Sequence, residues 1–226
     1  MKVEITRNGQ RDPLTFNRPI LLLVEGGDDS ALTEKIILST FKESSSLWQI
    51  HEMGGNQTGW QSELEIILSL DEFDKAGRSI GLIMDADLDY SASLRRCEDV
   101  LRRNGLPTPS SSEKVASDKR WKTGIYLMPG QGRTGALENL VLDTLGSARV
   151  DLAKDYLLQV EKYRNSPFKN NFKSLVQAYL AGEQSVVKTL KNAIEKGIIA
   201  DMSHTSLDEF REFLEELSAE RNDTTI

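Results

Sequence analysis

Four short apolar runs, each followed by a longer amphipathic segment, constrain the fold of this 226-residue chain most. The runs lie at residues 19–24, 47–53, 79–84 and 121–130. A short apolar run bounded by turn residues is typical of a buried strand in a parallel sheet. The segments between the runs repeat apolar residues at helical spacing, and two of them end at Gly77 and Gly105. The alternation predicts an α/β fold, with a mostly parallel sheet and helices on both faces.

The pattern divides the chain into two parts. Residues 15–147 contain all four predicted strands and form the predicted sheet domain. The stretch at residues 106–120 is polar and rich in proline and serine, so we expect an exposed connection there. Residues 148–220 contain four amphipathic helical segments and no strand pattern. We therefore predict a C-terminal all-helical extension, packed on the sheet domain or on a partner protein.

The overall charge limits the class of partner. The chain carries a net charge of −7 and has a pI near 5.1, which argues against a nucleic-acid binder that relies on bulk positive charge. Nucleic acid stays open as a substrate, because cations bound to clustered carboxylates reverse the local charge. A single cysteine, Cys97, excludes an intramolecular disulfide and fits a reducing cytoplasm. The first twelve residues lack the apolar core of a signal peptide, and no membrane-spanning run is expected.

Acidic residues follow three of the predicted strands. Glu25 follows the first strand, Asp85, Asp87 and Asp89 follow the third, and Glu138 lies one turn into the helix after the fourth. Ligands of parallel α/β sheets bind beyond the carboxyl ends of the strands. Alternate residues of an extended chain point to one face, so Asp85 and Asp87 are expected to aim at the same point. The sequence thus predicts a cluster of carboxylates at one edge of the sheet.

Such a cluster favours a bound cation. Carboxylates held close together repel each other unless a cation neutralises them. A set of oxygen ligands without histidine or cysteine favours Mg²⁺ or Mn²⁺ over zinc. Two positions have an alternative interpretation: Asp89 is either a further ligand or the cap of the next helix, and Asp29 is either a further carboxylate of the site or a helix cap.

Three motifs carry a resemblance to a known family. "LLLVEGGDD" and "GLIMDADLD" resemble the first two motifs of Toprim domains, and "GIYLMPGQGRTGALENLV" resembles the last Toprim segment of nucleases of the overcoming-lysogenization-defect (OLD) type. The resemblance covers about residues 18–145. It implies a Toprim-like, Rossmann-like sheet, and it extends more weakly to small stand-alone Toprim-like proteins with a helical tail.

The resemblance also implies roles for individual residues. Glu25, Asp85, Asp87 and Glu138 match the catalytic and metal-binding carboxylates, and Asp29 matches a position that contributes a further carboxylate or else caps the helix. Several Toprim proteins act beside an ATPase in phage defence, so the resemblance implies an ATPase partner. The chain has no Gly-x-x-x-x-Gly-Lys-Ser/Thr phosphate loop, and hence no recognisable ATPase of its own.

Residues for substrate binding are expected in the loops. Arg133 either clamps a phosphate or only solvates its loop. Gly26 and Gly27 form the turn after the first strand, and Asn56 belongs to the loop "GGNQTG" before the second helix. Lys122 ends a basic run that either contacts nucleic acid or forms a solvated turn with Trp121 packed on the sheet.

We therefore expect a Mg²⁺-dependent Toprim nuclease that hydrolyses DNA or RNA in the cytoplasm. The alternative is a non-catalytic module that binds a nucleotide or nucleic acid and docks a partner through its helices. A flavodoxin-like receiver domain shares clustered carboxylates, but the chain lacks a suitable strand-end threonine and lysine pair. Homo-oligomerisation is left open, and no membrane is expected.

Overall fold

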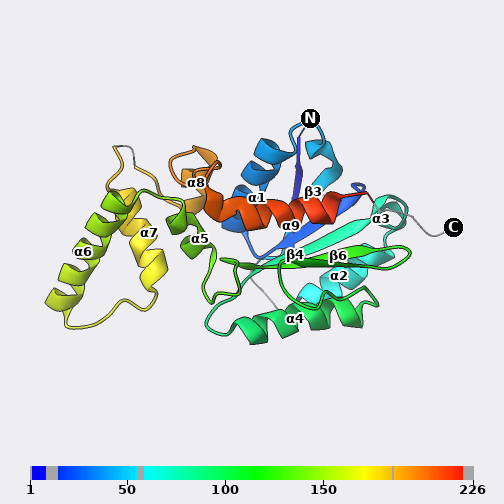
Figure 1. Ribbon diagram of the computed structural model, residues 1–226, viewed down its shortest axis with the longest axis horizontal. Helices are drawn as coiled ribbons and strands as arrows, with labels where there is room; N and C mark the ends of the chain where they lie inside the picture. Colours follow the sequence, from blue (N-terminus) through cyan, green and yellow to red (C-terminus); the bar gives the residue numbers. More distant parts are fainter. Residues whose placement is uncertain (1, 9–14, 55–58, 185, 221–226) are drawn as a thin grey trace.

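The computed structural model describes residues 2–8, 15–54, 59–184 and 186–220 (Figure 1). Its six-stranded sheet has the order β1-β3-β2-β4-β6-β5, and every neighbouring pair is parallel except β5 with β6. The strands are β1 (Glu4–Arg7), β2 (Ile20–Val24), β3 (Trp48–Glu52), β4 (Ser79–Asp85), β5 (Lys114–Ser117) and β6 (Lys122–Met128). The predicted α/β fold with a mostly parallel sheet is confirmed.

The described helices follow the predicted alternation and then the predicted helical region. They are α1 (Gly27–Thr40), α2 (Trp60–Ser69), α3 (Asp71–Ala76), α4 (Tyr90–Arg103), α5 (Leu137–Asp143), α6 (Ser147–Arg164), α7 (Asn171–Ala181), α8 (Leu190–Glu195) and α9 (Asp208–Ser218). The single helix expected before Gly77 is divided, because Leu70 has extended backbone angles between α2 and α3. The helix expected at residues 185–197 is shorter, since Thr189 caps α8 by accepting from the Asn192 N–H.

Two strands lie where the sequence predicted none. β1 precedes the expected start of the domain, and β5 lies in the stretch expected to be an exposed connection. Both are four-residue strands at the edges of the sheet, and Lys114 and Ser117 at the ends of β5 are exposed. An edge strand pairs on one side only and is often short and polar. These strands therefore lack the apolar run that marked the central ones.

The sheet separates two apolar cores. On one face, Leu21 and Leu23 of β2 pack with α2, α3 and α4. On the other face, Leu22 and Val24 pack with α1, α8 and α9. Successive residues of a strand point to opposite faces, so a continuous apolar run such as that of β2 supplies both cores at once.

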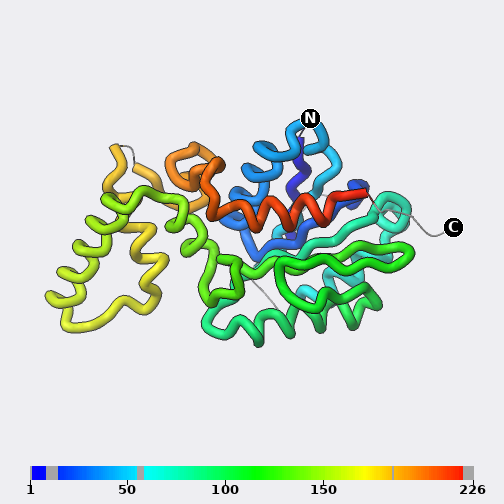
Figure 2. The backbone as a smooth tube through the Cα atoms, in the orientation of Figure 1, coloured from blue at the N-terminus to red at the C-terminus, as the bar shows by residue number. Residues whose placement is uncertain are grey.

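Helix α9 lies over β4, β6 and β5 although it comes last among the described helices (Figure 2). Gly81 and Gly124 face each other across β4 and β6 and leave a trough in the sheet. A Cβ atom at Gly124 would lie 2.6 Å from Phe213 Cε2, and one at Gly81 would lie 2.9 Å from Leu217 Cδ2. The two glycines thus let the apolar side of α9 approach the sheet closely.

The predicted helical extension has two different parts. Helix α9 packs on the sheet domain, which was one of the two expected arrangements. Helices α6 and α7 form a hairpin that projects from the body of the molecule (Figure 1). Among the described residues, no helix is both long enough and apolar enough to cross a bilayer.

The contact between α9 and the sheet gives a stability prediction. Phe213 is 1% exposed and lies 5.4 Å from Tyr126 between ring centroids. Phe213→Ala should therefore lower the free energy of unfolding by about 3–5 kcal/mol, as measured by urea unfolding. Glu212→Ala, on the exposed side of the same helix, should change it by about 0.5 kcal/mol or less. Equal effects of the two substitutions would contradict the packing of α9 on the core.

Candidate functional site

The ends of β2 and β4 meet at the carboxyl edge of the sheet. Glu25 directly follows β2, while Asp85 is the last residue of β4. Parallel pairing of Val24 with Ile83 places the two acidic residues near each other. Glu25 Oε1 accepts a hydrogen bond of 3.3 Å from the backbone N–H of Asp85. One oxygen of the Glu25 side chain is thereby directed to the end of the neighbouring strand.

Asp85 connects this edge to helix α5. Its Oδ1 atom accepts a hydrogen bond of 2.9 Å from the backbone N–H of Leu137, the first residue of the helix. Leu137 has a free N–H to donate because the first N–H groups of a helix have no partner within the helix. The next residue, Glu138, is 7% exposed and lies at the same edge. This bond therefore holds Glu138, which follows β6, close to Asp85 at the end of β4.

Helix α1 brings a third carboxylate. Gly26 caps α1, and its N–H donates to Asp29 Oδ2 at 3.0 Å. Asp29 is 8% exposed, although it lies in the first turn of the helix. Asp29 is thus not the cap itself, since Gly26 occupies that position, but its side chain binds the N–H of the cap and also lines the site.

These residues surround one pocket of about 230 Å³. Its lining residues are Glu25, Gly26, Asp28, Asp29, Gly54, Asp85, Leu137, Glu138 and Lys173. Five of the nine are acidic and one is basic. Glu25, Asp29, Asp85 and Glu138 are thus brought together as the sequence predicted, together with Gly26.

Two lysines at this edge were not anticipated from the sequence. Lys173 of α7 has its Nζ atom 3.7 Å from Glu138 Oε1. The backbone N–H of Lys191 in α8 donates to Asp28 Oδ1 at 2.7 Å, and its Nζ atom lies 3.7 Å from Glu52 Oε1. Both lysines belong to the helical region after residue 147, where no strand end marks a position at the site. No sequence signal distinguished them from other exposed lysines.

Burial and mutual repulsion change the acidity of two carboxyl groups. Burial raises the pKa of Asp85 to about 8, and the charges of Asp29, Glu25 and Glu138 add to the effect. Burial, followed by the charge of Glu25, raises the pKa of Asp29 to about 7. Both groups therefore tend to hold a proton at neutral pH unless another positive charge replaces it.

The carboxylate oxygens of the pocket suit the predicted Mg²⁺ or Mn²⁺. Carboxylate oxygens are the ligands that these hard cations prefer. Within the described ranges, no three His, Cys, Asp or Glu side chains form a ready coordination shell. Mg²⁺ commonly binds through one or two carboxylates and keeps several waters. Glu25 and Asp85, which both line the acidic pocket, fit a partly hydrated cation of this kind.

The other two aspartates of the third motif lie elsewhere. The chain is not extended at Asp87, which has φ 53 and pairs with Gly135 through two backbone hydrogen bonds of 2.8 Å. Its side chain is half-exposed, 3.6 Å from Arg96, and does not line the pocket. Asp89 Oδ1 accepts from the Ala92 N–H and caps α4, as one of its two interpretations predicted.

The residues expected to bind substrate are only partly at the pocket. Gly27 follows Gly26 in the first turn of α1, whereas Arg133 forms an ion pair of 2.8 Å with Asp143. Asn56 lies outside the described residues.

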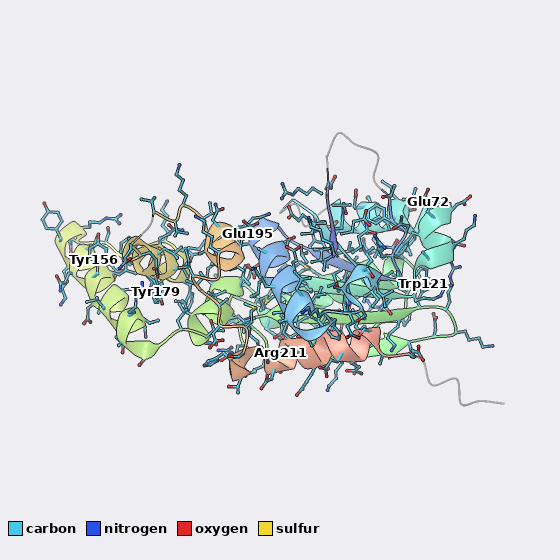
Figure 3. The ribbon with its side chains drawn as sticks, turned by 90° about the horizontal axis from the view of Figure 1, so that it is seen from above. Glu72, Trp121, Tyr156, Tyr179, Glu195 and Arg211 are labelled. Atoms are coloured by element: carbon cyan, nitrogen blue, oxygen red, sulfur yellow. The ribbon has the colours of Figure 1, made fainter. Side chains whose placement is uncertain are left out.

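The structure places Lys122 away from the pocket. This residue begins β6 at the opposite edge of the sheet, where its Nζ atom donates to the Glu216 and Ala219 carbonyls. Trp121 beside it is 8% exposed and stacks on Phe73 at 5.6 Å, so the alternative with Trp121 packed on the sheet is confirmed. Figure 3 shows Trp121 at one end of the molecule and Tyr179 of α7 at the other.

The raised pKa values predict how stability depends on pH. Between about pH 4 and pH 8 the folded chain keeps a proton on Asp85 that the unfolded chain releases, so this group lowers stability as pH rises. Asp85→Asn removes that titration. In EDTA, the variant should therefore gain stability relative to the unmodified chain as pH rises from 5 to 8, measured by urea unfolding.

Glu65→Gln, an exposed substitution on α2, serves as the control and should follow the unmodified chain at every pH. A difference between Asp85→Asn and the unmodified chain that stays constant with pH would contradict the raised pKa.

Comparison with known proteins gives a family but no described relative. No curated protein and no solved structure matches the chain. One family model matches residues 19–219, which include β2 to β6, every residue of the pocket and helix α9. The chain belongs to the family described as "Protein of unknown function (DUF3226)".

Proposed function

We propose that the chain is a Mg²⁺- or Mn²⁺-dependent hydrolase of phosphodiester bonds in DNA or RNA. The observation that carries the proposal is the pocket in which buried Asp29 and partly buried Asp85 meet Glu25, Glu138 and Lys173. Two carboxyl groups with raised pKa values in a polar pocket are typical of a functional site. They also bind a divalent cation favourably, because the cation removes the repulsion that burial imposes.

Hydrogen bonds from backbone N–H groups orient the Glu25 and Asp85 carboxylates to hold the cation. Each of these side chains accepts one hydrogen bond from a neighbouring element, which fixes the direction of its carboxylate. Asp29 and Glu138 lie beside them and add negative charge. When bound, Mg²⁺ would lower the pKa of a coordinated water and stabilise charge on the leaving oxygen.

Two positive groups, Lys173 and the N-terminus of α1, favour binding of a phosphate in the same pocket. Lys173 lies on its rim with a side chain that is 63% exposed. The N-terminus of α1 opens into the pocket at Gly26, and helix N-termini favour anions. A phosphodiester would thus meet Lys173 and the first turn of α1 while the carboxylates hold the cation.

The resemblance to Toprim domains supports this assignment. Three residues carried over from the family motifs, Glu25, Asp85 and Glu138, line one pocket, whereas the fourth, Asp87, does not. The resemblance also underlies a further part of the proposal, namely action beside an ATPase partner in phage defence, and we propose a place in the cytoplasm. Buried Cys97, the one cysteine of the chain, suits a reducing compartment.

A second candidate is a module that binds a nucleotide or nucleic acid without cleaving it. Two observations favour it: the described residues offer no ready shell of three ligands, and Arg133 already pairs with Asp143. The two candidates share the cation site and differ only in turnover.

The first experiment compares cleavage of plasmid DNA, single-stranded DNA and RNA in Mg²⁺, Mn²⁺ or EDTA. We expect cleavage with either metal and none in EDTA. Glu25→Gln and Asp85→Asn should each lower the rate by about 100-fold or more, because outer-shell substitutions already cost about 10- to 100-fold. Glu65→Gln, an exposed glutamate on α2, should leave the rate unchanged.

Calorimetry with Mg²⁺ and Mn²⁺ separates the remaining outcomes. Metal binding that Asp85→Asn abolishes, without cleavage of any substrate, would support the binding module. Cleavage that survives both Glu25→Gln and Asp85→Asn would refute the proposed hydrolase.

The second experiment tests Lys173. Lys173→Met removes the positive charge beside Glu138, so we expect a KM for the nucleic acid at least about tenfold higher and a weaker dependence on salt. Lys154→Met removes an exposed lysine from α6, away from the pocket, and should change neither quantity. An unchanged KM in Lys173→Met would show that this lysine pairs with Glu138 and does not bind the substrate.

A further inference from the structure

Helix α6 carries apolar residues on two opposite sides. Val150 and Ala153 are buried in the core that includes α7. Leu152, Tyr156 and Tyr163 point away from that core and are 70%, 60% and 93% exposed. Figure 1 shows α6 on the side of the hairpin away from the sheet, so this surface is not covered by the rest of the described chain.

The exposed residues follow a regular spacing. Leu152, Tyr156, Gln159 and Tyr163 are separated by steps of four, three and four residues, and we name them the outer stripe. Apolar residues with this spacing form the contact seam of coiled coils, where a second helix packs along the first. The outer stripe therefore has the geometry of a surface that contacts another helix.

A groove beside the stripe fits the same interpretation. It has a volume of about 580 Å³ and lies between α6 and α7. Small residues, Ala153, Ala178 and Gly182, line it together with Leu152 and Tyr156. Figure 3 shows Tyr156 and Tyr179 on this hairpin. Large projecting rings next to a groove with small residues form a surface that can fit a rotated copy of itself.

The charges along the stripe specify the direction of the second helix. Asp155 and Lys162 are both exposed, and they lie seven residues, or about two turns, apart on one flank. In the described part of the chain, neither side chain takes part in an ion pair. If an identical helix packs antiparallel on α6, Asp155 of each copy lies opposite Lys162 of the other. In a parallel pair the two residues would be separated.

We propose that α6 is the interface of a homodimer, with two copies packed antiparallel about a two-fold axis near residues 157–158. Leu152 of one copy then contacts Tyr163 of the other, and Tyr156 contacts Gln159. The exposed parts of Tyr156 and Tyr163 from both copies supply about half or more of the roughly 1,000 Å² that a specific interface needs. The two hairpins together form a four-helix arrangement.

Charge reversal tests both the partner and the direction. Sedimentation equilibrium of the full chain at about 100 µM should show a dimer, since the expected Kd is on the order of micromolar. Asp155→Lys and Lys162→Asp each turn two attractive pairs into repulsive ones and should raise the Kd about tenfold or more. The double variant Asp155→Lys/Lys162→Asp restores opposite charges and should return the Kd to near its original value.

A second variant tests the apolar contacts. Tyr156→Ser/Tyr163→Ser removes four rings from the interface and should give a monomer whose circular dichroism matches that of the unmodified chain. Phe172→Ser, at an exposed apolar residue of α7, should leave the dimer intact. A monomeric unmodified chain, or single reversals that the double variant does not rescue, would overturn the proposal and assign the surface to another protein.

Discussion

Parallel pairing of β2, β4 and β6 determines where the acidic residues of this chain can lie. Parallel strands all end at the same edge of the sheet. Glu25 and Asp85 are therefore neighbours although sixty positions separate them. The bond from the Leu137 N–H to Asp85 then extends the arrangement to α5 and Glu138. A change in register at any of these strands would separate the carboxylates, since one position moves a side chain to the other face.

This convergence has an electrostatic cost. Asp29 is buried and Asp85 partly buried among like charges, and desolvation contributes most to their raised pKa values. Folding alone does not favour such a group, because a hydrophobic residue would fill the space without repulsion. The cation that we propose for this pocket would offset this cost. Lys173 contributes one positive charge beside Glu138 and does not balance the acidic residues alone.

The sequence predicted the central part of this arrangement for clear physical reasons. Continuous apolar runs marked β2, β4 and β6, and the acidic residues that follow them identified Glu25, Asp85 and Glu138. Other features left no such pattern. Edge strands β1 and β5 are short and polar, and Asp87 departs from an extended chain because its backbone pairs with Gly135. The sequence also did not show which lysine lies near the pocket. Lys173 reaches it because α7 packs beside α5, whereas Lys122 lies at the opposite edge because it begins β6.

The trough formed by Gly81 and Gly124 also affects the order in which the protein can complete its fold. Phe213 fills this trough, yet it is synthesised 89 positions after Gly124, when the hairpin of α6 and α7 has already been made. Contacts so distant in sequence form slowly, because the loop between them must close first. Until α9 arrives, one face of the sheet presents leucine, isoleucine and tyrosine side chains to solvent. A ribosome-bound or truncated chain that lacks α9 is therefore the form most exposed to aggregation and to capture by chaperones.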